Sequence, residues 1–164
     1  MSRFVRSITQ VQACNNKQNI AVAILSAGVG SRIKSYEPRS MIKIGTQTLV
    51  EHQIRTIDKI TKRIRGSVRI VENQIYNETN TAESMRLAFN NTLKKNHLFI
   101  HGDLYFNQET LSGLDYGKSF ILIDDSGQFA EKEVGVTANK GVATILSYGL
   151  PTKWAQIVYV TGKE

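Results

Sequence analysis

A short apolar strand pattern that runs straight into a glycine-rich loop constrains this chain more than any other feature. Ile20–Leu25 is a β-branched run of the kind that forms a buried strand. In the segment that follows, Ser26-Ala27-Gly28-Val29-Gly30-Ser31-Arg32, the two glycines let a phosphate approach backbone N–H groups closely, and the arginine adds a delocalised cation. The residues therefore predict a phosphate-binding loop at the end of a buried strand.

The loop by itself leaves two interpretations open, because a Gly-x-Gly turn also serves purely structural purposes. It lacks the Gly-Lys-Ser/Thr ending of a Walker A motif, and Ile33 stands where the dinucleotide fingerprint has its third glycine. Pro38-Arg39 and Lys43 follow a short distance further on and bring more positive charge toward the same loop. These cations shift the prediction toward phosphate binding.

The predicted elements change in kind halfway along the chain. Strands and helices alternate first: strand Ile20–Leu25, a helix from the capping box Thr48-Leu49-Val50-Glu51 to about Ile64, strand Val68–Val71, a helix from Asn80 to about Lys94, strand Leu98–Ile100 and a short helix Asn107–Leu114. Short strands follow: Phe120–Ile123, Val134–Ala138, Val142–Leu146 and Ile157–Val160, with a hairpin turn at Asn139-Lys140-Gly141. This order predicts an α/β domain with a mixed sheet, a βαβαβ half followed by antiparallel strands.

The bulk properties fit one globular domain. The 164 residues suit a single domain over residues 20–164, preceded by a polar arm over residues 1–19 that we expect to be loosely ordered. No apolar run approaches the roughly 20 residues that a membrane span needs, so we expect no membrane association. The lone Cys14 fits a cytoplasmic protein.

The net charge of +7 favours an anionic partner, although a solubilising surface explains it about equally well. Nucleic acid is the less favoured partner. The tight basic cluster Lys62-Arg63-Ile64-Arg65 is not interleaved with aromatic residues, as a nucleic-acid-binding stripe more often is.

Beyond these local patterns, the sequence resembles the nucleotidyltransferases of glycosyltransferase-A-like fold, which make sugar-nucleotides, CDP-alcohols and molybdopterin dinucleotides. The segment Ser26–Arg32 matches their signature loop, Pro38-Arg39 stands where they have Pro-Lys, and Ile44–Ile54 is similar to their first helix. The resemblance implies a Rossmann-like three-layer αβα fold with a mixed, mostly parallel sheet. It also implies that either Arg39 or Lys43 takes the place of the family's lysine.

A second matching feature is His101-Gly102-Asp103, at the end of a predicted strand. In the family, a Gly-Asp at this point supplies a carboxylate that holds Mg²⁺, so the resemblance implies Asp103 as a metal ligand and Mg²⁺ as a cofactor. Mg²⁺ usually needs only one or two protein carboxylates, with water and substrate oxygens in its other positions. No residue of this sequence can be assigned to the second acidic ligand that family members often have. The alternative is that Asp103 only caps the turn after the strand.

A third feature, Tyr76–Ser84, is similar to a stretch of the phosphocholine- and phosphonate-type cytidylyltransferase branch that lies beside the nucleoside. In this interpretation Asn80 and Ser84 hydrogen-bond the base or the ribose from the start of a helix. Asn80 serves equally well as a helix cap, and the two interpretations stay open.

The resemblance implies transfer of a nucleoside monophosphate from an NTP, with CTP preferred, to a small phosphate- or phosphonate-bearing acceptor, with release of pyrophosphate. In this hypothesis the nucleotide is bound by Ser26, Ala27, Gly28, Gly30 and Ser31, and the catalytic cations are Arg32, Arg39 and Lys43. Assembly into a homo-oligomer is left open. Family members usually continue past the position of Glu164, so the alternative is a shortened module of the same fold that binds nucleotide without transferring it. A nucleic-acid-binding protein and a Rossmann dehydrogenase fit less well.

Overall fold

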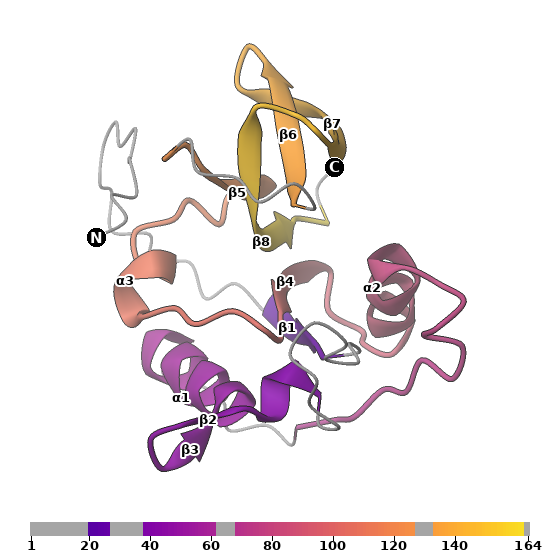
Figure 1. Cartoon of the computed structure of the whole chain (residues 1–164), viewed down its shortest axis with the longest axis vertical. Helices are drawn as coiled ribbons and strands as arrows, with labels where there is room; N and C mark the ends of the chain where they lie inside the picture. The colour runs from indigo at the N-terminus through magenta and orange to yellow at the C-terminus, as the bar shows by residue number, and fades with distance from the viewer. Residues whose placement is uncertain (1–19, 27–37, 62–67, 127–132, 163–164) are drawn as a thin grey trace.

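The computed structural model describes residues 20–26, 38–61, 68–126 and 133–162, which form a mixed β-sheet with helices on both faces (Figure 1). The strands are β1 (Ile20–Leu25), β2 (Lys43–Ile44), β3 (Gln47–Thr48), β4 (Asn96–His101), β5 (Phe120–Asp124), β6 (Val134–Asn139), β7 (Val142–Tyr148) and β8 (Thr152–Val160). The helices are η1 (Arg39–Met41, a 3₁₀ turn), α1 (Leu49–Thr61), α2 (Thr81–Asn90) and α3 (Gln108–Leu111).

The main sheet has the order β1-β4-β8-β6-β7, and β5 also pairs with β8. Strands β1 and β4 are parallel, in a register that runs from Ile20↔Asn96 to Leu25↔His101. The pairs β4–β8, β5–β8, β6–β7 and β6–β8 are antiparallel. The predicted α/β class with a Rossmann-like mixed sheet is confirmed, with its helix-linked parallel strands first and its antiparallel strands later.

The predicted strand at Val68–Val71 is wrong, and the parallel part of the described sheet is correspondingly smaller than predicted. These residues have no regular secondary structure, and Val68 and Ile70 are 67% and 84% exposed. The preference of β-branched residues for strands comes mainly from packing on a half-buried sheet surface. Here that burial is lacking, and the Arg69 guanidinium instead donates to the carbonyl of Asn91.

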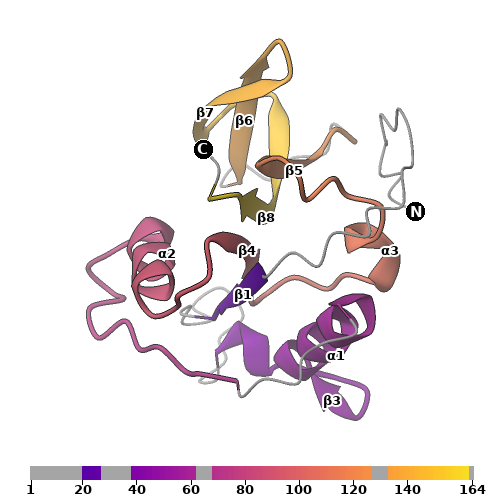
Figure 2. The same cartoon turned by 180° about the vertical axis from the view of Figure 1, so that it is seen from behind.

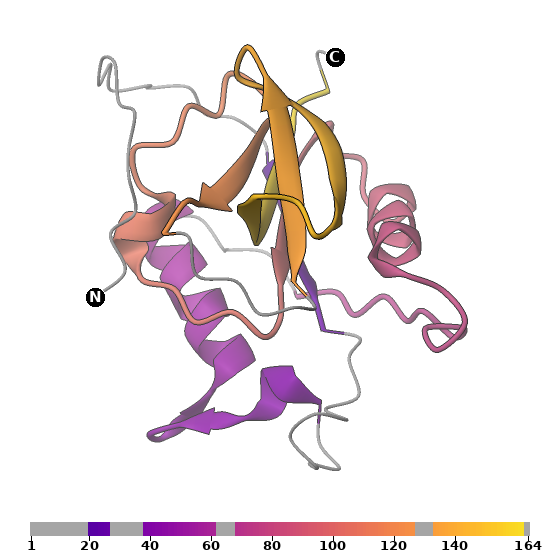
Figure 3. The same cartoon turned by 45° about the horizontal axis from the view of Figure 1, so that its top comes forward.

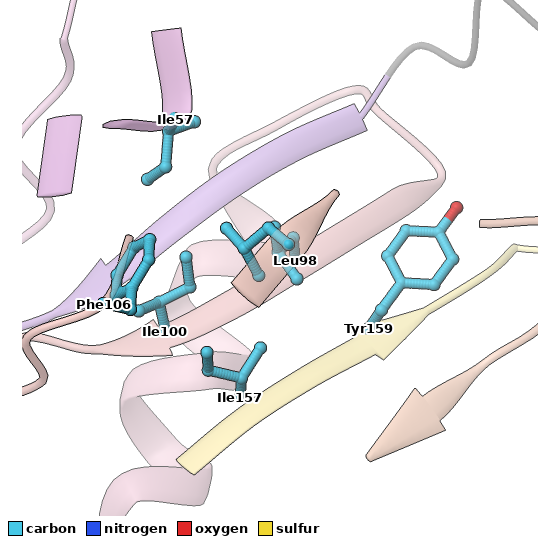
Figure 4. Close-up of a cluster of buried hydrophobic side chains, with 7 residues drawn as sticks. Ile57, Leu98, Ile100, Phe106, Ile157 and Tyr159 are labelled. Carbon is cyan, nitrogen blue, oxygen red and sulfur yellow. The ribbon is translucent and has the colours of Figure 1, made fainter. Parts of the chain in front are cut away.

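The helices cover opposite faces of the sheet, as the predicted three-layer arrangement requires (Figures 2 and 3). Side chains alternate along a strand, so β4 serves both faces. On one face, the core joins β4 and β8 to α1 and α3. Its buried members are Ile57, Leu98, Ile100, Phe106, Leu111, Ile157 and Tyr159, and all of them except Leu111 are labelled in Figure 4. On the other face, Phe89 of α2 packs against His97 and Phe99.

Local signals set the ends of several elements where the sequence predicts them. The capping box forms at the start of α1: the Thr48 N–H donates to Glu51 Oε2 at 2.7 Å, and the Glu51 N–H donates to Thr48 Oγ1 at 3.3 Å. Helix α2 begins after the predicted cap Asn80, although it ends at Asn90 rather than near Lys94. No helix in the described part of the chain is long and apolar enough to cross a membrane.

The predicted hairpin turn between β6 and β7 is also confirmed. Lys140 and Gly141 have φ angles of 49° and 78°, the left-handed conformations that a tight two-residue hairpin requires.

The core between α1 and the sheet predicts a large difference between two chemically identical substitutions. Ile57 is 1% exposed and Ile70 is 84% exposed, so Ile57→Ala should lower the free energy of unfolding by about 2–5 kcal/mol, whereas Ile70→Ala should change it by about 0.5 kcal/mol or less. Urea denaturation of both variants measures this, and equal effects would contradict the packing of α1 described above.

Candidate functional site

The candidate site lies where the parallel strands β1 and β4 end. Ser26 follows β1 directly, and Gly102 and Asp103 follow β4. The Gly102 N–H donates to the carbonyl of Leu25 at 2.9 Å, so the two chain segments leave the sheet side by side. The carboxyl ends of parallel strands form the edge where ligands bind in open α/β sheets.

Gly102 is required by this close approach rather than by its backbone angles. A Cβ atom at this position would lie 2.6 Å from Ser26 Oγ, and 3.1 Å from both the Leu25 carbonyl oxygen and Ser26 Cα. Without a side chain, the turn that carries Asp103 can lie directly against the first residue of the glycine-rich loop.

An ion pair joins two residues that the sequence assigns to separate motifs. Arg39 Nη1 donates to Asp103 Oδ2 at 2.9 Å, across 64 positions of sequence. Arg39 opens the turn η1, which follows Pro38 and is closed by a hydrogen bond from the Met41 N–H to the Pro38 carbonyl. The two charged side chains are 24% and 32% exposed, and a pair so open to water contributes little stability, about 0–1 kcal/mol. Its significance is that it places a cation and a carboxylate together at the carboxyl edge of the parallel strands.

The remaining predicted cations and loop residues are placed differently. Lys43 is exposed on the β2–β3 hairpin. The pKa of Glu51 is lowered chiefly by its hydrogen bond from the Thr48 backbone, and the positive charge of Lys43 adds a smaller effect. Five predicted site residues lie outside the described part of the chain: Ala27, Gly28, Gly30, Ser31 and Arg32.

The two predicted nucleoside-binding residues lie at the start of α2, Asn80 as its N-cap and Ser84 in the helix, and each makes a contact within the protein. Asn80 Oδ1 accepts from the Ala82 N–H at 3.0 Å, which is the capping bond. Ser84 Oγ accepts from Asn73 Nδ2 at 3.2 Å. Since α2 is the last helix before β4 and packs on β1, its first turn faces the same edge of the sheet as Asp103.

Two residues of α1 hold the segment that carries Asp103, and the sequence analysis assigned them no role. Gln53 Nε2 donates to the carbonyls of His101 and Leu104, and His52 Nε2 donates to the carbonyl of Phe106. The signal that could have found Gln53 is its spacing. It lies four residues after Leu49 and four before Ile57, so it interrupts the buried stripe of the helix with a polar side chain.

The side chain of His101 is packed within the protein. Its ring meets Trp154 edge-on, with ring centroids 5.2 Å apart. Burial lowers the pKa of His101, and the negative charge of Asp103 opposes that shift without cancelling it. The imidazole is therefore neutral near pH 7.

The chemistry of the donor set at Asp103 fits a magnesium ion held mostly by substrate. The Asp103 carboxylate is partly exposed, and one of its oxygens is bonded to Arg39. The described residues contain no group of three or more His, Cys, Asp or Glu side chains that would form an all-protein metal cage. Mg²⁺ commonly needs only one or two protein carboxylates, with phosphate oxygens and water completing its octahedron.

Comparison with known proteins supports the fold. No family model and no curated protein matches this chain. Among solved structures, the chain is similar to the inositol-1-phosphate CTP transferase from T. maritima, with a TM-score of 0.69 and 15% sequence identity over 90% of this chain and 72% of that one. The chain therefore shares a nucleotidyltransferase-like fold with this enzyme, as its motifs predict.

The close approach of Gly102 to Ser26 predicts that substitutions at these two positions change the free energy of unfolding non-additively. Gly102→Ala should lower the free energy of unfolding by about 1–3 kcal/mol, because the new methyl group overlaps Ser26 Oγ. Ser26→Ala alone should be nearly neutral, since Ser26 is exposed, yet it should recover part of the loss in the double variant. Chemical denaturation of the four proteins gives the coupling energy, and simple additivity would show that this contact is not the source of the cost.

Proposed function

We propose that this chain transfers a nucleoside monophosphate from an NTP, preferentially CTP, to a small acceptor that carries a phosphate or phosphonate, and releases pyrophosphate. The observation that carries the proposal is the Arg39–Asp103 pair at the carboxyl edge of β1 and β4, beside the first residue of the glycine-rich loop. The motifs in residues 26–32 and the fold shared with a CTP transferase support it.

The proposed reaction needs no protein nucleophile. An oxygen of the acceptor's phosphate attacks the α-phosphorus, a new phosphorus–oxygen bond forms, and the bond from the α-phosphorus to the bridging oxygen breaks as pyrophosphate leaves. Catalysis then consists of positioning and of stabilising the charge that builds on the phosphate oxygens. A Mg²⁺ ion bound at Asp103 supplies part of that stabilisation.

The chain's own cations supply the rest. In this proposal the backbone of Gly28 and Gly30 and the side chain of Arg32 hold the β- and γ-phosphates. Arg39 is favoured over Lys43 at the α-phosphate, because Arg39 already lies against Asp103 whereas Lys43 is exposed on a hairpin. A guanidinium has five N–H donors in a planar fork, so Arg39 can keep Asp103 oriented with one N–H and offer others to phosphate.

The preference for CTP and the class of acceptor are supported by the start of α2 and by the structural neighbour. The start of α2, with Asn80 and Ser84, lies at the correct edge to contact the nucleoside, and Asn80 Oδ1 would have to share its capping bond with it. The structural neighbour is named as a transferase of CTP and inositol 1-phosphate. A phosphorylated polyol is accordingly the first acceptor class to test, and residues 20–164 are the domain that we propose carries the activity.

Substitutions at the ion pair test the proposal. Asp103→Asn and Arg39→Gln should each lower kcat/KM for pyrophosphate release by about 10²–10³, because each removes a charge aimed at the reacting phosphates. Asp125→Asn, the same chemical change at an exposed carboxylate, is the control. The assay is pyrophosphate release with four NTPs and a panel of phosphorylated polyols, aminoalcohols and phosphonates.

Binding measurements separate the proposal from its alternative. Calorimetric binding of CTP in the presence of Mg²⁺, with no turnover on any acceptor, would identify a nucleotide-binding module of the same fold. If no NTP binds, or if Asp103→Asn leaves Mg²⁺-dependent binding unchanged, the site has been assigned wrongly.

A further inference from the structure

Helix α1 holds the segment 101–106 through its main chain. Gln53 Nε2 donates to the carbonyl oxygens of His101 at 2.9 Å and Leu104 at 2.7 Å. His52 Nε2 donates to the carbonyl oxygen of Phe106 at 2.8 Å. Asp103 lies between the two residues whose carbonyls Gln53 binds, so its backbone is fixed on both sides from one amide group.

Both nitrogens and one face of the His52 ring have partners within the protein. Because a carbonyl oxygen accepts from Nε2, that nitrogen carries the proton, and Nδ1 accepts from Gln47 Nε2 at 3.3 Å. The ring also stacks on Tyr105, with centroids 4.4 Å apart and planes 16° apart. The ring of His52 therefore holds the segment both by a hydrogen bond and by its face.

Both N–H donors of the Gln53 amide are used on the segment that carries Asp103. The side chain of Gln53 is fully buried, and both carbonyls on its NH₂ group belong to the Asp103 segment. Its Oε1 atom is buried without a hydrogen-bond partner among the described residues. An apolar residue at this position would leave the carbonyls of His101 and Leu104 without this donor, so the side chain serves the backbone of the Asp103 segment while its own Oε1 stays unpaired.

The Asp103 carboxylate is thus oriented from two directions. The ion pair with Arg39 acts on the carboxylate itself, and α1 acts on the backbone at both sides of it. Helix α1 is a firm support, because its first turn is closed by the capping box and Ile57, one turn after Gln53, is in the core. Sites supported by helices hold their geometry more closely than sites that depend on loops alone.

We propose that His52 and Gln53 are positioning residues that hold Asp103 where it meets the metal and phosphates of a bound nucleotide; this inference rests on the function proposed above. They act through the main chain of residues 101–106 and do not contact the nucleotide. Their loss should weaken the use of Mg²⁺ more than it weakens the fold.

Three substitutions isolate the contacts. His52→Phe keeps an aromatic ring against Tyr105 and removes the donor to Phe106, whereas His52→Gln restores an N–H donor at the position of Nε2. Gln53→Met keeps the length of the side chain and removes both hydrogen bonds. The matched control is Glu51→Ala, which weakens the cap of the same helix, because the Glu51 carboxylate bonds the backbone and side chain of Thr48 and makes no described hydrogen bond to residues 101–106.

The main measurement is binding of CTP by calorimetry across a Mg²⁺ titration and again in EDTA. His52→Phe and Gln53→Met should raise the Mg²⁺ concentration for half-maximal CTP binding by about 10–100-fold, the usual effect of removing groups that orient a metal ligand. Binding in EDTA should stay within about two-fold of the wild type, and His52→Gln should recover most of the Mg²⁺ response. Glu51→Ala should lower the melting temperature without changing that response.

Each other outcome has a definite meaning. If the Mg²⁺ response of all four variants follows their melting temperatures, or does not change, the positioning role is refuted. If Asp103→Asn abolishes the response and the α1 variants do not alter it, this inference fails while the proposed function stands. If the wild type shows no Mg²⁺-dependent binding, the proposed function fails and this inference with it. Should Gln53→Met not fold, the two His52 variants decide the question.

Discussion

The parallel pairing of β1 with β4 is the constraint on which the candidate site depends. The register sets Leu25 opposite His101, and the hydrogen bond from the Gly102 N–H to the Leu25 carbonyl extends the ladder one residue beyond it. A shift of one residue would turn Leu98 and Ile100 away from α1 and separate Ser26 from Gly102. The burial of β4 on both faces therefore fixes the geometry of two motifs that are 76 residues apart, counted from Ser26 to Gly102.

Features of the fold that are encoded locally could be predicted from the sequence. The capping box at Thr48 and Glu51, the cap Asn80 and the hairpin turn at Lys140-Gly141 each depend on residues within a few positions of one another. Val68–Val71 has the same local preference as a real strand, but a strand also needs a neighbour and a covered face, and no local pattern reports whether these exist.

The residues of the candidate site also differ in whether the sequence alone could predict their contacts. The motifs indicated that Arg39 and Asp103 have related roles, yet only the folded structure shows that their side chains meet. The contributions of His52 and Gln53 were missed, because their partners are backbone carbonyls, which every residue has and no sequence pattern marks. The sequence carries a trace of Gln53 alone, as a long polar side chain between Leu49 and Ile57 on the buried side of α1.

The position of β8 in the sheet has a consequence for how the chain folds. Strand β8 pairs with β4, β5 and β6, so the strand formed by residues 152–160 is central although it is the last of the described strands in sequence. Until it is in place, β4 has one free edge and the buried ring of Tyr159 is missing from the core. Pairing of such distant segments is slow, because the loop entropy is lost before the contacts form. During synthesis, the ends of β1 and β4 that carry the candidate site can therefore pair early, while the strand on the other edge of β4 is added only with β8.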